Sequence, residues 1–411
     1  MLSNAPAWRI GVCALDRDGL PYGPDVVGVI RQDEPADYRE AARKLAADGT
    51  DLVSIQHEYG IFGGPDGDYV LEFADELVKL GLPYVVTLHT VLSKPAPGQA
   101  EVLSQLCRHA VRVTVFTETA RRIAGQAGYA DPDRLVVIPH GVPVSLREPV
   151  EPDQVGPELR AALSAVAGHT VLSTFGLLRP GKGLETAIAA LPQVVAKHPD
   201  VRYVIAGATH PEIARVSGEE YRTQLIDQAR ALGVGDQVLF VDAFLTEPEL
   251  AVLLARTNIY LTPYKLEQQT CSGALTFALA AGCPVVSTEY KYAVDLVTPP
   301  DGPARGTLVP FDDPTAFATA INDLLDDPVR LANVREAAGK LGAELTWPAV
   351  GARFAAVFAG AVPAGRARSS MRMRPARLSE LVEGSQGTQT AGGEPVWAPH
   401  RQRPASANPA P

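Results

Sequence analysis

The chain of 411 residues carries 37 lysines and arginines against 47 aspartates and glutamates, a formal net charge of −10. Its length predicts two or three domains, and 46% hydrophobic residues with 20% charged residues exclude disorder over the whole chain. The acidic balance argues against a dedicated nucleic-acid binder, but it is compatible with a local phosphate site.

The cysteines and the apolar segments indicate in which cellular compartment we expect the protein. The four cysteines form no Cys-x-x-Cys pair, which disfavours a zinc ribbon or a thioredoxin-type site and is typical of reduced thiols. Residues 1–6 contain no basic region followed by an apolar run, and the longest apolar stretches are short and interrupted by glycine and proline. We therefore expect a cytoplasmic protein with no signal peptide and no transmembrane segment.

Two series of short, β-branched runs predict strands, and helix-length amphipathic segments separate them. The predicted strands are 9–15, 51–55, 84–88, 112–116 and 135–138, then 170–175, 202–206, 238–241, 259–262 and 284–287. The predicted helices are 37–47, 69–80, 118–127, 184–197, 221–232, 247–255 and 314–325. Strands that are almost continuously apolar are typical of parallel sheets covered on both faces. The fold class is therefore α/β, with two Rossmann-like, doubly wound domains.

Composition also marks a boundary and a tail. Prolines punctuate a polar stretch within 144–168, which divides the body into domains at 1–155 and 156–345. We expect a disordered tail over 365–411, where residues 366–411 contain seven arginines and three glutamates, a charge of +4. Such a tail suits peripheral contact with an anionic membrane or an acidic partner, although a solvated extension is the simpler interpretation.

A glycine-rich segment follows the strand 170–175. Gly176, Gly181 and Lys182 fit the spacing G-x-x-x-x-G-K, but a P-loop needs Ser or Thr at the next position to hold Mg²⁺, and this chain has Gly183. A P-loop nucleotide hydrolase is therefore the weaker alternative, and a plain turn that opens a helix is another. We favour a site in which Arg179, Lys182 and the backbone N–H groups bind a diphosphate.

A second polar loop leads into an apolar helix that ends at Gly282. Thr270, Ser272 and Gly273 lie near the start of this helix, where unpaired N–H groups suit a phosphate or a sugar hydroxyl. Capping of the helix by Ser or Thr is the simpler explanation of each residue alone. The presence of Arg179 and Lys182 in the same domain favours a binding site.

These segments carry a family resemblance. The sequences FGLLRPGKGLETAIAAL (175–191) and ALAAGCPVVST (278–288) resemble the retaining nucleotide-sugar glycosyltransferases of family 4, or group 1. The segment VIPHGV (137–142) resembles the family's turn into the inter-domain region. The segments IQHEYGIFGG (55–64), TLHTVL (87–92) and TCSGAL (270–275) resemble a mannosyltransferase-like subgroup. The resemblance covers about 9–358.

The resemblance implies the GT-B fold, two Rossmann-like domains facing a cleft, with a helix at 346–364 that packs back on the N-terminal domain. It implies that the C-terminal domain binds a nucleotide-diphosphate sugar and that the N-terminal domain binds the acceptor. A hexose, mannose or glucose, would move with retention of configuration to a saccharide, lipid or polyol. No D-x-D metal site is visible, so Arg179 and Lys182 would stabilise the leaving diphosphate with no metal and no cofactor beyond the co-substrate.

The chain departs from the family pattern at two places. Two glutamates with seven residues between them usually contact the donor, but the matching positions here are Gln269 and Phe277, and Glu267 lies close but out of register. We therefore predict donor contacts from Gly176, Gln269, Thr270, Ser272, Gly273 and Glu267, besides Arg179 and Lys182. We also expect the N-terminal domain to begin at the family's second strand, without the first strand and its glycine-rich loop. A catalytically degenerate binding or scaffold protein is therefore an alternative.

Histidines follow two neighbouring strands of the first domain. His57 and Glu58 come after the strand 51–55, and His89 comes after 84–88, so we expect them at the same sheet edge. We predict His57 and His89 as catalytic groups that exchange protons near neutral pH. We place Glu58, His140 and a flexible loop with Gly63 and Gly64 on the acceptor side. A hydrogen-bonded loop histidine is the alternative in each case.

Overall fold

The computed structural model describes residues 8–148 and 155–362. The predicted tail at 365–411 lies outside the described residues. None of the helices in the described ranges is long and apolar enough to cross a membrane.

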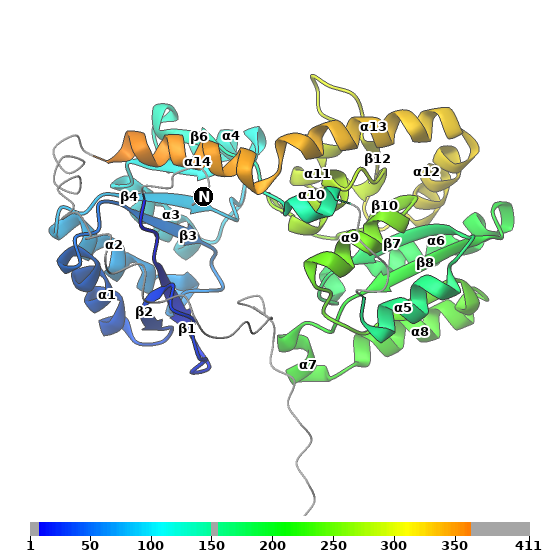
Figure 1. Ribbon diagram of the computed structural model, residues 1–411, viewed down its shortest axis with the longest axis horizontal. Coiled ribbons are helices and arrows are strands. Elements are labelled where there is room, and N and C mark those ends of the chain that lie inside the picture. Colours follow the sequence, from blue (N-terminus) through cyan, green and yellow to red (C-terminus); the bar gives the residue numbers. More distant parts are fainter. Residues whose placement is uncertain (1–7, 149–154, 363–411) are drawn as a thin grey trace, which may run out of the picture. The chain divides into compact units, whose positions relative to one another are not determined.

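The first half of the chain forms two parallel sheets with helices between the strands (Figure 1). A four-stranded sheet has the order β3-β4-β5-β6, and β1 and β2 form a separate two-stranded sheet. The strands are β1 (Val12–Asp16), β2 (Val26–Arg31), β3 (Val53–His57), β4 (Tyr84–Leu88), β5 (Arg112–Val115) and β6 (Leu135–Val137). The helices are α1 (Pro35–Ala47), α2 (Tyr69–Lys79), α3 (Pro97–Arg108) and α4 (Glu118–Gln126).

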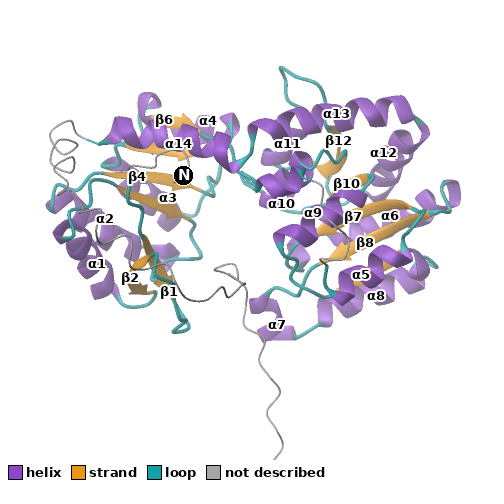
Figure 2. Cartoon of the chain, viewed as in Figure 1, coloured by secondary structure: helices purple, strands orange, loops and turns teal. Residues whose placement is uncertain are grey.

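The second half forms a six-stranded parallel sheet with the order β12-β11-β10-β7-β8-β9 (Figure 2). Its strands are β7 (Thr170–Phe175), β8 (Val201–Ala206), β9 (Val238–Val241), β10 (Ile259–Thr262), β11 (Val285–Thr288) and β12 (Gly306–Val309). Its helices are α5 (Pro157–Ala165), α6 (Leu184–Lys197), α7 (Pro211–Ser217), α8 (Glu220–Ala231), α9 (Glu247–Arg256), α10 (Gly273–Ala280), α11 (Lys291–Val297), α12 (Pro314–Asp326) and α13 (Pro328–Glu344).

The second sheet is buried on both faces, as its apolar strands predict. Val171 and Leu172 are consecutive in β7, yet they belong to two different hydrophobic clusters. Successive side chains of a strand point to opposite faces, so each face of the sheet has its own core. The order of the strands reverses between β7 and β10, which makes that pair the topological switch point where ligands of such sheets bind.

The last described helix, α14 (Trp347–Ala361), packs on the first half of the chain. Val350, Phe354 and Phe358 form one buried cluster with Val85 of β4 and Ile138. The entry to the helix is fixed by two backbone hydrogen bonds of 2.8 Å that join Val142 to Leu345 and to Trp347. The two halves are therefore connected by covalent linkage and by this returning helix.

Candidate functional site

A pocket of about 200 Å³ lies at the switch point of the second sheet. The segment after β7 contributes Arg179, Gly181 and Lys182, and the segment after β10 contributes Tyr264 and Gln269. The remaining lining residues, 271–274, lead into α10. The two segments that the sequence singled out separately therefore form one pocket, because the carboxyl ends of neighbouring parallel strands share an edge.

The segment after β7 holds Lys182 in place. Its Nζ atom donates to the backbone oxygen of Phe175 at 3.4 Å and to the hydroxyl of Tyr264 at 3.1 Å. Gly176 has a φ of 113°, and a Cβ there would lie 3.0 Å from Lys182 Nζ. Gly183 has a left-handed φ of 61°, and a Cβ there would lie 2.0 Å from the oxygen of Pro263. The Ser or Thr of a P-loop does not fit this position, which disfavours the hydrolase alternative.

The pocket is electropositive. Its lining contains Arg179 and Lys182 but no carboxylate. Arg179 is exposed and has no hydrogen-bond or ion-pair partner among the described residues. Lys265, by contrast, forms ion pairs with Glu185 and Asp312 and does not line the pocket. Two uncompensated cations beside each other are a suitable environment for a diphosphate.

The start of α10 adds backbone donors to the same pocket. Ser272 is the N-cap, and its hydroxyl accepts a hydrogen bond from Leu275 N at 3.3 Å. The amides of Gly273 and Ala274 occupy the first helical positions, where no intrahelical acceptor exists, and both residues line the pocket. The positive end of the helix dipole therefore reinforces the two cations.

The other predicted donor contacts lie less directly at the pocket. Gln269 lines it, and its Nε2 donates to the oxygen of Cys271 at 2.8 Å. Thr270 does not line it, because its buried hydroxyl accepts a hydrogen bond of 2.9 Å from Val91 N of the first half. Glu267 does not line it either, and it forms an ion pair of 3.4 Å with Lys291.

His57 differs from its prediction. It is the last residue of β3 rather than a loop residue, since it pairs with Leu88 of β4, and it shares the buried face of the strand with residues 53 and 55. Its ring lies between Tyr59 and Phe62, with centroids 5.0 and 5.8 Å away, and neither ring nitrogen has a partner among the described residues. Burial and, secondarily, His89 lower the pKa of His57 to about 4. A neutral, enclosed imidazole is unsuited to proton exchange at neutral pH.

His89 lies beside His57 in a less enclosed position. Its backbone N donates to the oxygen of His57 at 3.0 Å, and its Nε2 lies 3.1 Å from Gln56 Oε1. Burial and, secondarily, His140 lower the pKa of His89 to about 4, so the ring is neutral at pH 7. Its ring meets Phe116 edge-on at 5.0 Å. His89 is therefore available as a neutral hydrogen-bonding group.

His140 connects the histidines to the pocket. Its ring lies 5.5 Å from that of Phe116, and its Nδ1 donates to the oxygen of Gly141 at 2.8 Å. With the proton on Nδ1, the Nε2 of a neutral ring is an acceptor, and burial lowers the pKa of this histidine. A Cβ built on Gly273 would lie 3.6 Å from this Nε2, so His140 reaches the start of α10.

The remaining acceptor-side residues are tightly packed. Both carboxylate oxygens of Glu58 accept hydrogen bonds, one from Tyr59 N at 3.0 Å and one from the hydroxyl of Thr90 at 2.6 Å. A Cβ on Gly63 would lie 2.1 Å from the backbone oxygen of Gln32, and Gly64 has a φ of 80°. These two glycines therefore allow the loop to pack closely against its neighbours.

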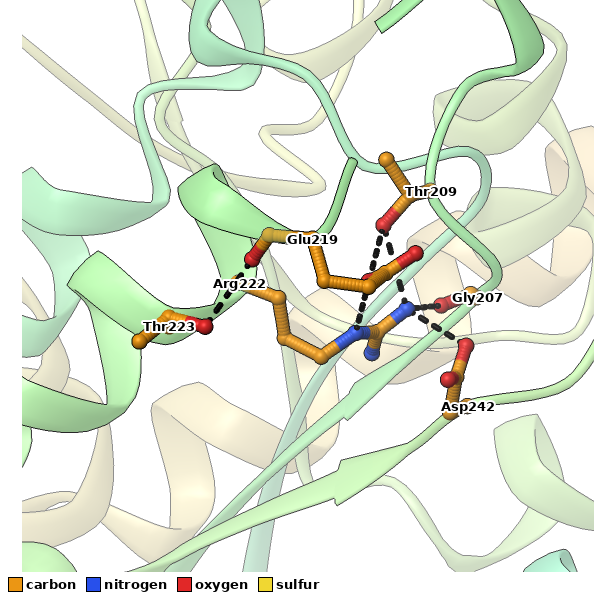
Figure 3. A network of polar contacts seen from close by, with 6 residues as sticks. All are labelled: Gly207, Thr209, Glu219, Arg222, Thr223 and Asp242. Atoms are coloured by element: carbon orange, nitrogen blue, oxygen red, sulfur yellow. Dashed lines mark hydrogen bonds and ion pairs between the residues drawn. The ribbon is translucent and has the colours of Figure 1, made fainter. Parts of the chain in front are cut away.

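A buried arginine network shapes the sheet edge beside the pocket, and sequence reasoning did not identify it (Figure 3). Arg222 of α8 donates from Nη2 to the oxygen of Gly207 at 3.0 Å and to Asp242 Oδ1 at 2.5 Å. Its Nε donates to Glu219 at 2.8 Å. A Cβ on Gly207 would lie 2.1 Å from the oxygen of Gly176. The network thus joins the ends of β8 and β9 next to the glycine-rich segment.

Tyr264 and Cys271 also line the pocket without having been predicted. Only their positions after a buried strand could have indicated them, since neither residue type is specific for phosphate. No group of three or more His, Cys, Asp or Glu side chains suitable for a metal ion occurs in residues 8–148 and 155–362.

Comparison with known proteins finds a family match over part of the chain. Residues 157–341, which contain every lining residue of the pocket, match the family model described as glycosyl transferases group 1. Residues 157–341 are therefore similar to group 1 glycosyltransferases. The solved structure of Anabaena Alr3699/HepE in complex with UDP superposes with a TM-score of 0.65 and 19% identity over 82% of this chain and 86% of its own. The predicted GT-B fold is confirmed.

Two curated relatives are named as a glycosyltransferase and a mannosyltransferase. The D-inositol 3-phosphate glycosyltransferase of Thermobispora bispora is 27% identical over 309 residues, which cover 69% of this chain and 66% of that protein. A GDP-mannose-dependent monoacylated alpha-(1-6)-phosphatidylinositol monomannoside mannosyltransferase of Corynebacterium glutamicum is 27% identical over 265 residues, 63% of this chain and 64% of that protein. The chain therefore spans just under two thirds of the length of both relatives.

Proposed function

We propose that the protein transfers a hexose from a nucleotide-diphosphate sugar to an acceptor hydroxyl, with retention of configuration and without a metal ion. The observation that carries the proposal is the convergence of Arg179, Lys182 and the amides that open α10 on one pocket without carboxylates. A nucleoside diphosphate is a leaving group whose negative charge grows as the glycosidic bond breaks. Fixed cations and amides stabilise that charge with little reorganisation.

Retention of the anomeric configuration is consistent with the cationic pocket of the second half and the neutral histidines of the first half. The acceptor oxygen forms its bond to the anomeric carbon on the face from which the diphosphate departs, and the acceptor proton passes to the departing phosphate oxygen. No strong side-chain base is then required. This agrees with His89, whose pKa of about 4 makes it a weak base at pH 7. We assign His89 and His140 to neutral hydrogen bonds with the sugar or the acceptor, and His57 to packing.

The substrates are proposed from the relatives. One relative is named as GDP-mannose-dependent, another acts on D-inositol 3-phosphate, and a structural neighbour contains UDP. We infer a GDP- or UDP-linked mannose or glucose as donor, and a polyol, saccharide or lipid-linked saccharide as acceptor. The first half faces the second through a hydrogen bond from Val91 to Thr270 and two from Ser93 and Lys94 to Gln268. Acceptor groups on that half would therefore lie near the donor pocket.

A catalytically degenerate binding protein is the second candidate. Gln269 and Phe277 stand where the family usually has glutamates, and Phe277 packs against His140 and Phe175 with centroids 6.3 Å from each. A protein of this kind would bind the nucleotide and transfer no sugar. An assay with sugar-labelled GDP-mannose and UDP-glucose separates the two candidates. A transferase moves the labelled sugar to an acceptor or to water, whereas a binding protein leaves the donor intact.

Calorimetric titration with GDP and UDP tests the donor site. We expect one nucleotide to bind, and we expect Lys182→Ala to weaken it at least roughly tenfold because a charge-assisted contact to the diphosphate is lost. Lys340→Ala is the matched control, because Lys340 pairs with Glu336 on the outer helix α13. If neither nucleotide binds the wild type, or if both variants bind equally well, the donor-site assignment is wrong.

A further inference from the structure

A larger cavity, of about 540 Å³, lies at the opposite end of α10 from the donor pocket. Helix α10 begins at the pocket with Gly273 and ends at this cavity, where Ala280, Ala281 and Gly282 form part of the wall. The helix has eight residues and is about 12 Å long. The two spaces are therefore separate and lie at opposite edges of the second sheet.

The cavity is lined by three arginines and one glutamate. Arg147 precedes the second domain, Arg256 ends α9, Arg335 lies on α13, and Glu148 follows Arg147. The lining therefore has a net charge of +2. None of the three arginines forms an ion pair within the described ranges, in contrast to Arg39, Arg134 and Arg222. Guanidinium groups without carboxylate partners are the usual means of binding phosphate.

Two of these arginines also have a structural role. Arg147 Nη1 donates to the backbone oxygens of Ala280 and Gly339 at 3.0 and 2.9 Å. Arg335 Nη2 donates to the oxygens of Thr257 and Asn258 at 3.1 and 3.2 Å. These bonds offset the negative dipole ends of α9 and α10 that would otherwise repel an anion. Each guanidinium has five N–H donors, so three of them have no partner among the described residues.

Capping of helix ends does not account for Arg256. Its side chain is exposed at the cavity and has no hydrogen-bond or ion-pair partner in the described parts of the chain. The rest of the lining is mostly apolar, with Leu146, Ala251 and Ala255 among its members. The lining therefore combines cationic and apolar residues, and the volume of the cavity is within the size range of small-molecule sites.

We propose that this cavity binds a small organic phosphate monoester. The phosphate contacts the guanidinium groups of Arg147, Arg256 and Arg335, and the organic part lies on the alanines of α9 and α10. The site is distinct from the donor pocket, and it does not depend on the proposed transferase activity.

Binding of phenyl phosphate to the purified full chain tests the proposal. The measurement uses isothermal titration in an Arg179→Ala/Lys182→Ala background, so that the donor pocket contributes no binding. We expect phenyl phosphate to bind more tightly than inorganic phosphate by roughly tenfold, because the ring buries apolar surface. Phenol, which lacks the charge, should not bind measurably.

Arg256→Glu provides the decisive variant in the same background. The exposed side chain of Arg256 has no hydrogen-bond or ion-pair partner among the described residues, so the variant should melt like its parent while phenyl phosphate affinity falls at least roughly tenfold. Arg122→Glu, which alters an exposed arginine of α4 outside the cavity, should leave the affinity unchanged. The proposal is overturned if the background protein fails to bind phenyl phosphate, or if Arg256→Glu binds it as well as Arg122→Glu does.

Discussion

The two halves of the molecule offer a substrate opposite kinds of chemistry. The pocket of the second half has two cations, amides at a helix start and no carboxylate. The histidines of the first half are enclosed by aromatic rings and are neutral at pH 7, with the pKa of His57 and His89 lowered to about 4. Under the proposed assignment, charge stabilisation belongs to the donor side, and neutral hydrogen bonding belongs to the acceptor side.

The donor side depends on backbone geometry as much as on charge, and Gly183→Ala tests this dependence. The substitution places a Cβ at a left-handed φ of 61° and 2.0 Å from the oxygen of Pro263. We expect the free energy of unfolding to fall by about 2–3 kcal/mol, from backbone strain and displacement of the segment after β10. Urea denaturation measures the loss, and nucleotide titration should show weaker binding in the same variant.

Gly181→Ala is the matched control two residues away. A Cβ at Gly181 meets no atom within 4 Å, and its φ is not in the left-handed region. This variant should change stability by less than about 0.5 kcal/mol. Equal losses of stability in Gly183→Ala and Gly181→Ala would show that the segment is not rigid. The donor side would then not depend on its backbone geometry.

Sequence patterns predicted the donor side better than the acceptor side, and the reason is physical. The strands 84–88, 170–175, 238–241 and 259–262 coincide with β4, β7, β9 and β10. Arg179, Lys182, Ser272 and Gly273 meet because residues after adjacent parallel strands share an edge, a rule that needs only strand order. The donor pocket is built from segments for which this rule is sufficient.

The acceptor side depends on packing that no local pattern reveals. His57 is buried because Tyr59 and Phe62 fold over it, and Gly63 and Gly64 lie in a packed turn.

The sequence patterns also missed one strand in each half, β2 and β12. Gly28 interrupts the apolar run of β2, which pairs with β1 alone, and β12 is a four-residue edge strand. Helix α3 begins at Pro97-Gly98, which is typical of a turn.

The acceptor side is tested by His57→Phe, which keeps a ring between Tyr59 and Phe62. In the folded protein the pKa of His57 is about 4, and in the unfolded chain it is about 6.5. The unfolded chain therefore binds more protons between these values, and stability falls as the pH decreases from 6.5 towards 4. Phenylalanine does not titrate, so the variant should lose part of this dependence and exceed the wild type by about 1–2 kcal/mol at pH 5.

Urea denaturation at several pH values measures the effect of His57→Phe. His89 keeps its own lowered pKa, so some acid sensitivity should remain. The exposed His109→Phe variant controls for loss of an imidazole at the surface. A His57→Phe protein that is stable but inactive would show that the ring nitrogens contact a substrate, which would restore His57 to the catalytic groups.

The smallest expected effect concerns Ser272. Its hydroxyl serves either as a helix cap or as a contact to the donor, and the two explanations predict different results. Its hydroxyl caps α10 by accepting from Leu275 N, so Ser272→Ala should cost about 1 kcal/mol of stability. Nucleotide affinity should change less than twofold, because the pocket is served by the amides of Gly273 and Ala274 rather than by the hydroxyl. Thr246→Ala, which removes the cap of α9 outside the pocket, is the control for stability alone. A fall in nucleotide affinity of tenfold or more in Ser272→Ala alone would assign the hydroxyl to the donor, and would mean that the cap and the ligand compete for one oxygen.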